Sequence, residues 1–142
     1  MTQIRYILDT DIITYHQFGK EPIVARLNAA NPDSVATTVV TLYEQLKGRL
    51  ASVNRNQSPK SQQIALQRLQ ATQTYYCSLT ILPFEAKAVR VYENLKHQKI
   101  RVGSQDLKIA SIAISLSATL VTNNTRHFEK IPDLKIENWT IT

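Results

Sequence analysis

The sequence predicts an α/β fold with a mainly parallel central sheet, arranged as three α/β/α layers. Short apolar segments alternate with longer segments whose apolar residues recur at helical spacing, which is the pattern of βαβ units. One of the longer segments, residues 107–116, is apolar nearly all round and should therefore lie at the centre of the molecule. With 142 residues, 43% of them hydrophobic, the chain is large enough for one domain spanning residues 1–142.

The expected strands are short, and the first of them, Tyr6-Ile7-Leu8 at its centre, reads as buried. Pro83 ends the third strand, because proline cannot donate to a sheet ladder. The predicted strands are residues 4–8, 34–38, 79–82, 119–122 and 135–139.

The expected helices begin and end at recognisable signals. Glu21-Pro22 opens one that Asn31-Pro32 ends. Thr41 and Glu44 have the spacing of a capping box, so a helix should run from there to about residue 52. A polar stretch, residues 54–63, should connect it to a second long helix starting near Ser61, which makes an αα-hairpin. A short helix or a turn is expected over residues 12–16. Further helices are expected over residues 84–97 and 107–116, the last with Ser104 as its N-cap, and residues 126–132 are expected to be irregular.

Composition narrows the functional classes. The formal net charge is +6 with a pI near 9.6, which suits a polyanionic partner such as nucleic acid, although solubility alone also explains it. Three glycines argue against a glycine-rich phosphate loop. The single cysteine, Cys77, excludes an internal disulfide and is expected to be a small buried hydrophobe in a reducing compartment. No signal peptide or membrane span is recognisable, so a cytoplasmic protein is expected.

Four polar side chains are expected at one end of the sheet. Asp9 follows the first strand, Glu44 lies early in the helix after the second, Asp106 begins the most buried helix and Asn124 follows the fourth strand. In parallel α/β sheets, ligands bind outside the carboxyl ends of the strands. Crowded carboxylates raise one another's pKa, and a hard divalent cation, Mg²⁺ or Mn²⁺, relieves that repulsion. Two such ions can drive phosphodiester cleavage, and a basic surface would hold the nucleic acid.

The chain resembles the PIN-domain ribonucleases, specifically the VapC-type toxins of bacterial toxin–antitoxin pairs. The resemblance covers nearly the whole chain, and its specificity comes from several short motifs in the right order. These motifs are residues 8–12 (LDTDI), 41–46 (TLYEQL), 103–110 (GSQDLKIA) and 118–128 (ATLVTNNTRHF), followed by Pro132 and residues 137–139 (ENW).

The resemblance implies a PIN-like fold and assigns the family's acids to Asp9, Glu44 and Asp106, the expected metal ligands. A fourth family acid maps onto Asn124, an amide that cannot carry the charge but can still orient a metal-bound water. Asp11 stands where the family often has asparagine, and it either lies near the metal or caps the following turn.

The resemblance also implies partners and supporting residues. Thr10 and Thr122 match hydroxyl residues that support such sites. Arg126, from its own chemistry, is either a phosphate contact or part of a structural ion pair. The implied activity is that of a Mg²⁺-dependent endoribonuclease, with Mn²⁺ as a possible substitute. The implied partners are an RNA substrate, a cognate VapB-like antitoxin and a second copy of the chain.

Structural explanations compete with each assignment. Asp9 alone would simply end a strand, the capping box would explain Glu44, and the helix dipole would favour Asp106. Asn124 would serve as a turn residue with positive φ. His127 is interpreted as a surface or packing residue.

Two other functions remain as alternatives. A degenerate PIN domain would bind RNA or protein without cutting, and Asn124 is the argument for it. A haloacid-dehalogenase-like phosphatase would use Asp9 as nucleophile and Asp11 as acid/base. That chemistry requires a further lysine and a late pair of acids, where this chain has Asn123-Asn124, and it leaves Glu44 without a role.

Overall fold

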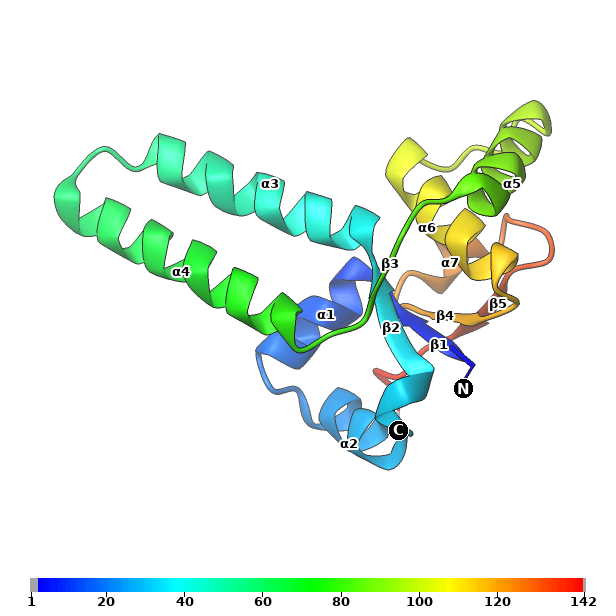
Figure 1. Ribbon diagram of the computed structural model, residues 1–142, viewed down its shortest axis with the longest axis horizontal. Coiled ribbons are helices and arrows are strands. Elements are labelled where there is room, and N and C mark those ends of the chain that lie inside the picture. Colours follow the sequence, from blue (N-terminus) through cyan, green and yellow to red (C-terminus); the bar gives the residue numbers. More distant parts are fainter. Residues whose placement is uncertain (1–2, 142) are drawn as a thin grey trace.

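The computed structural model describes residues 3–141 and contains a five-stranded parallel sheet. The strand order is β3-β2-β1-β4-β5, and each of the neighbouring pairs is parallel (Figure 1). The strands are β1 (Tyr6–Leu8), β2 (Val35–Thr38), β3 (Ile81–Leu82), β4 (Thr119–Val121) and β5 (Lys135–Glu137). The predicted fold class is therefore confirmed, and each strand lies within its predicted range.

Helices connect the strands and cover the sheet. They are α1 (Thr10–Gln17), α2 (Glu21–Ala29), α3 (Val39–Arg55), α4 (Pro59–Cys77), α5 (Ala86–His97), α6 (Ser104–Ser115) and α7 (Thr125–Phe128), with a short 3₁₀ turn at Pro32–Ser34. Within residues 3–141, no helix is long and apolar enough to cross a membrane.

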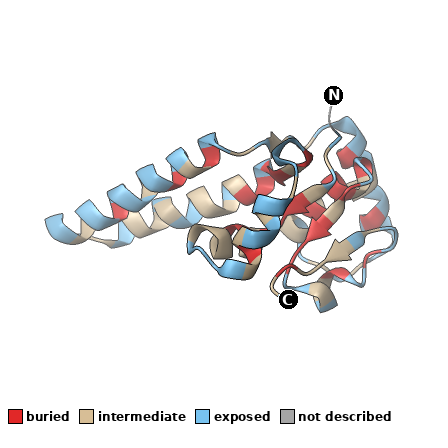
Figure 2. Cartoon of the chain, turned by 90° about the horizontal axis from the view of Figure 1, so that it is seen from below, coloured by how far each residue is buried: buried red, intermediate tan, exposed pale blue. Residues whose placement is uncertain are grey.

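The sheet is buried on both faces, which gives the three layers. Ile7 and Leu120 point into one core together with α5 and α6, whereas Leu8 and Val121 point into a second core with α1 and α2. This alternation follows from the two-residue period of a strand. Helix α6 is largely buried along its length, as its all-round apolar sequence predicts. Figure 2 shows that the buried residues are concentrated around the sheet, whereas the projecting helical hairpin is mostly exposed or half-buried.

Helices α3 and α4 form the predicted αα-hairpin and extend well beyond the sheet (Figure 1). The connection between them is shorter than expected, residues 56–58, because Ser58 caps α4 by accepting a hydrogen bond from the Ser61 backbone N at 3.2 Å. Pro59 then occupies the first helical position, where its missing N–H costs nothing.

Three local predictions are wrong. Helix α3 begins at Val39, and its N-cap is Thr38, whose hydroxyl accepts from the Thr41 backbone N at 3.1 Å. The N-cap of α6 is Gly103, so Ser104 is already helical. Cys77, at the last position of α4, is exposed rather than buried. In addition, the segment expected to be irregular contains the short helix α7.

Candidate active site

The candidate site lies at the carboxyl end of the two central strands. From β1 the chain builds β2 and β3 on one side and later adds β4 and β5 on the other, so the topological switch point lies between β1 and β4. Asp9 directly follows β1, and Thr122 directly follows β4. This is where open α/β sheets bind their ligands.

Asp9 is held rigidly by two hydrogen bonds. Its Oδ1 accepts from the Thr10 backbone N, which makes it the N-cap of α1, and its Oδ2 accepts from Thr122 Oγ1, both at 2.8 Å. The residue is only 6% exposed. Burial, followed by the charge of Asp11, outweighs these hydrogen bonds and raises the pKa of Asp9 to about 7.

Glu44 contacts the Thr10 hydroxyl, and it takes no part in capping α3. Thr10 Oγ1 donates to Glu44 Oε1 at 3.1 Å and also lies 3.1 Å from Thr41 Oγ1. Burial, and to a smaller extent the charge of Asp106, raises the pKa of Glu44. The capping-box explanation of Glu44 is therefore wrong, because Thr38 caps the helix.

Only one of the two carboxylate oxygens of Asp11 accepts a hydrogen bond from the described residues. Its Oδ2 accepts from the Asn123 backbone N at 3.0 Å. Its Oδ1 is buried without a hydrogen-bond partner, the one such side-chain atom among the described residues. Burial and the charge of Asp106 raise the pKa of Asp11. Asp9, and not Asp11, caps α1, so the alternative of a capping role for Asp11 is wrong.

Asp106 comes from α6 and contacts a residue whose role the sequence did not reveal. His127 Nε2, from α7, lies 3.0 Å from Asp106 Oδ2. The interpretation of His127 as a surface or packing residue missed this contact, because no sequence spacing relates the two helices. The charge of Asp106 also contributes to the raised pKa values of Asp9, Asp11 and Glu44, although burial is the larger cause for each.

Asn124 and Arg126 are more peripheral. Asn124 is exposed and precedes α7, whose N-terminus its side chain does not cap. Its φ of −96° rules out the left-handed turn considered above. Its backbone N donates to Thr122 Oγ1 at 3.0 Å, so Thr122 links Asn124 to Asp9. Arg126 is exposed and forms no ion pair with residues 3–141.

The donor set fits a hard divalent cation. The site offers carboxylate oxygens, which are the ligands that Mg²⁺ and Mn²⁺ prefer, and the buried Asp11 Oδ1 has no other partner. The acids are positioned by separate contacts. Across residues 3–141, no three His, Cys, Asp or Glu side chains already converge on a common point.

The chain matches known proteins along nearly its whole length. The family model of the PIN domain matches residues 6–134. Ribonuclease VapC2 of Rickettsia felis is 36% identical over 94% of this chain and 97% of its own length, and ribonuclease VapC1 of Haemophilus influenzae is 33% identical over 95% and 98%. The chain therefore belongs to the PIN-domain family and, within it, to the VapC ribonucleases.

Solved structures share the fold along nearly the whole chain. The crystal structure of DNA-bound VapBC from Salmonella typhimurium superposes with a TM-score of 0.76 at 27% identity, covering 96% of this chain and 99% of that one. VapBC2 from Rickettsia felis bound to a promoter DNA fragment superposes with a TM-score of 0.68 at 30% identity, with the same coverage.

Proposed function

We propose that this protein is a metal-dependent endoribonuclease that cleaves RNA phosphodiester bonds and acts as the toxin of a VapBC-type pair. The observation that carries the proposal is the set of acids at the switch point, including the unpartnered Asp11 Oδ1. The relatives add weight, since one of them, from Shigella flexneri, is named a tRNA(fMet)-specific endonuclease.

Asp9, Glu44 and Asp106 would hold Mg²⁺, or Mn²⁺ in its place, with Asp11 as a further oxygen donor. A bound divalent ion supplies an activated water and neutralises charge on the leaving oxygen. Thr10 and Thr122 orient the acids through the hydrogen bonds described above. Asn124, which is exposed, would orient water or substrate.

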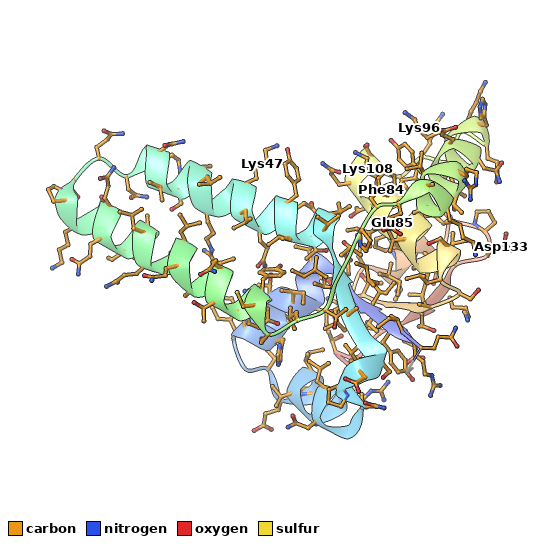
Figure 3. The ribbon with its side chains drawn as sticks, in the orientation of Figure 1. Lys47, Phe84, Glu85, Lys96, Lys108 and Asp133 are labelled. Carbon is orange, nitrogen blue, oxygen red and sulfur yellow. The ribbon has the colours of Figure 1, made fainter. Side chains whose placement is uncertain are left out.

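A basic surface supports RNA as the substrate. Residues 45–84, which include most of the α3–α4 hairpin, contain five lysines and arginines and no acid. Lys96 of α5 and Lys108 of α6 lie over the ring of Tyr92, and Lys47 of α3 lies over the ring of Tyr43. Figure 3 shows Lys47, Lys96 and Lys108, from three helices, along one side of the molecule. Interleaved cations and aromatic rings are typical of single-stranded RNA binding.

The partners would be a VapB-like antitoxin and a second copy of the chain. VapBC complexes are among the structural relatives, which supports the antitoxin. An apolar stripe on α3 supports the homodimer, because Val39, Tyr43 and Leu50 are exposed and recur at helical spacing. A stripe of this kind is normally buried against another helix.

The remaining expectations enter as parts of the proposal. Residues 1–142 act as one domain, which the extent of the family match supports. The protein works in the cytoplasm, where a free, exposed Cys77 stays reduced.

The function is tested by incubating the purified chain with structured RNA and Mg²⁺ or Mn²⁺. Cleavage should disappear with EDTA and fall by more than about a hundredfold in Asp9→Asn, as for loss of an electrostatic group acting on the transition state. The control is Asp133→Asn, an exposed acid outside the site. Cleavage that survives EDTA or Asp9→Asn contradicts the metal-site proposal.

The second candidate, a degenerate PIN domain, has one observation in its favour: an exposed amide, Asn124, stands where the family commonly has an acid. Tight RNA binding without cleavage of any RNA in either metal would establish it. The phosphatase alternative has lost its basis, because the chain belongs to the PIN-domain family and Glu44 is part of the site.

A further inference from the structure

A pocket lies next to the candidate site, on the side of α1 and α2. It has a volume of about 280 Å³, and its lining combines an aromatic ring, an ammonium group, a side-chain amide and a hydroxyl. The lining residues are Tyr15, Lys20, Pro22, Ile23, Asn123 and Thr140. None of them belongs to the acidic site, yet Asn123 is bonded directly to it through the contact between its backbone N and Asp11 Oδ2 at 3.0 Å.

The Asn123 side chain is fixed in one orientation. Its Oδ1 accepts from Asn138 Nδ2 at 3.1 Å and lies 3.1 Å from Thr140 Oγ1. Asn138 is itself oriented, because its Oδ1 accepts from the Thr140 backbone N at 2.9 Å and from Thr140 Oγ1 at 2.6 Å. The Nδ2 of Asn123 therefore faces the other way and donates to Tyr15 Oη at 3.3 Å. An amide nitrogen has two hydrogens, so one donor of Asn123 is left to meet a ligand in the pocket. Because the network is already in place, this donor costs little entropy to use.

The other walls suit the remaining parts of a nucleotide. Lys20 is exposed, and its Nζ lies 4.4 Å from the centre of the Tyr15 ring, so a cation and an aromatic ring stand together. Unpaired RNA bases are recognised by aromatic contact and by hydrogen bonds to their edges, while lysine binds phosphate without regard to sequence. A pocket with these groups is matched to one flipped-out base and its phosphate.

We infer that this pocket binds a nucleobase next to the bond that is cut, with Asn123 reading the base edge, Tyr15 contacting the ring and Lys20 binding a neighbouring phosphate. The inference rests on the proposed ribonuclease function and deepens it by assigning sequence preference to a defined position of the RNA. Asn123 links recognition to chemistry, because the same residue that reads the base holds Asp11.

The first test is independent of cleavage. The four nucleoside 5′-monophosphates are titrated into the full chain, and NMR signals of the Asn123 side-chain amide and the Lys20 and Thr140 backbone amides are followed. One base should bind roughly two- to tenfold more tightly than the others, the range of one added hydrogen bond. Lys20→Gln should weaken all four by a similar factor and keep their order, since lysine contacts phosphate.

Two further variants sharpen the test. Asn123→Ala should abolish the preference among bases, and Lys87→Gln, an exposed lysine on α5, should change nothing. Asn123→Ala also removes the contacts of Asn138 and Thr140, so its fold is checked by thermal unfolding. If Asn123→Ala is unstable, Lys20→Gln still tests the inference, because Lys20 is exposed and its replacement should not disturb the fold. Absence of shifts at the pocket for all four nucleotides overturns the inference.

The second test uses RNA oligonucleotides randomised around the cut, with fragments identified by sequencing. Tyr15→Leu and Asn123→Ala should relax the preference at one position. An unchanged preference in both variants overturns the inference. If Tyr15→Leu and Asn123→Ala instead weaken inhibition by the antitoxin and leave nucleotide binding and base preference unchanged, the pocket receives a protein side chain and the inference is overturned. Nucleotide binding at the pocket without RNA cleavage would leave the pocket assignment standing and reject the ribonuclease function.

Discussion

At the scale of single residues, the site is a balance between burial and hydrogen bonding. Asp9 accepts two short hydrogen bonds, which favour its charged form, and still has a pKa of about 7 because burial and the neighbouring Asp11 charge act more strongly. Burial is also the largest cause that raises the pKa values of Asp11 and Glu44. A cation at the site would remove this cost, since it replaces repulsion among carboxylates with attraction.

Without metal, stability should therefore fall as pH rises. Asp9 is protonated in both states below about pH 4, and between there and pH 7 the folded state keeps a proton that the unfolded state has lost. The shift of about three pKa units corresponds to roughly 4 kcal/mol of unfolding free energy, lost across that window. Denaturant unfolding in EDTA from pH 4 to pH 8 measures it. Asp9→Asn should flatten most of the slope, whereas Asp133→Asn should not.

A metal ion should reverse this loss at neutral pH. Binding to the native state alone stabilises it by about 2.7 kcal/mol when the ion is at a hundred times its dissociation constant. Thermal unfolding in MnCl₂ against EDTA should show a higher midpoint for the wild type and a much smaller gain for Asp9→Asn. Equal gains in both proteins would place the ion elsewhere.

At the scale of elements, the start of α3 matters for both stability and function. Thr38 is fully buried, caps the helix and contacts Thr41, which in turn meets Thr10 beside Glu44. The cap therefore sets the position of a candidate ligand. Ser58 caps α4 by the same kind of hydrogen bond, where α3 and α4 connect at the far end of the projecting hairpin (Figure 1).

These two caps make a matched pair of variants. Thr38→Ala and Ser58→Ala should each cost about 1 kcal/mol of unfolding free energy, the usual value of a lost N-cap. Only Thr38→Ala should also lower the rate of RNA cleavage, because it loosens the turn that carries Glu44. Denaturant unfolding and initial cleavage rates measure the two effects. An equal loss of activity in both variants would contradict the role assigned to the Thr38 cap.

At the scale of the whole molecule, the projecting α3–α4 hairpin leaves apolar surface without a partner in the single chain. Leu50 on α3 is 52% exposed, and Leu66 on α4 is 49% exposed. Only Leu50 belongs to the stripe with Val39 and Tyr43, which runs back toward the site. A dimer formed along this stripe would bring two acidic sites to one assembly.

The stripe predicts a simple effect on assembly. Leu50→Glu should convert the proposed dimer to a monomer, because an isologous interface would bring like charges close to each other on both copies. Leu66→Glu, with nearly the same exposure, should leave the dimer intact. Sedimentation equilibrium measures both. A wild type that is monomeric at all concentrations, or a dimer that survives Leu50→Glu, rejects this interface.

Much of this organisation is readable from local sequence. Short apolar runs and the 3.6-residue periodicity, together with Pro22, Pro32 and Pro83, predicted every strand and most helices, because they reflect interactions between near neighbours. Helix starts were less predictable. Thr41 and Glu44 have the residue types and the spacing of a capping box, in which Glu44 would accept a hydrogen bond from the Thr41 backbone N–H. In the structure, Thr38 Oγ1 accepts from that N–H instead.

The sequence by itself determined the fold class, the family and the placement of Asp9, Glu44 and Asp106 near strand ends and helix starts. Only the tertiary structure decided that Asp11 keeps a buried, unpartnered oxygen, that His127 meets Asp106 and that Asn123 joins a pocket to the site. The physical reason is distance along the chain. Asn123 and Asp11 are 112 positions apart, and such side chains meet only once the whole sheet has assembled and its helices have packed.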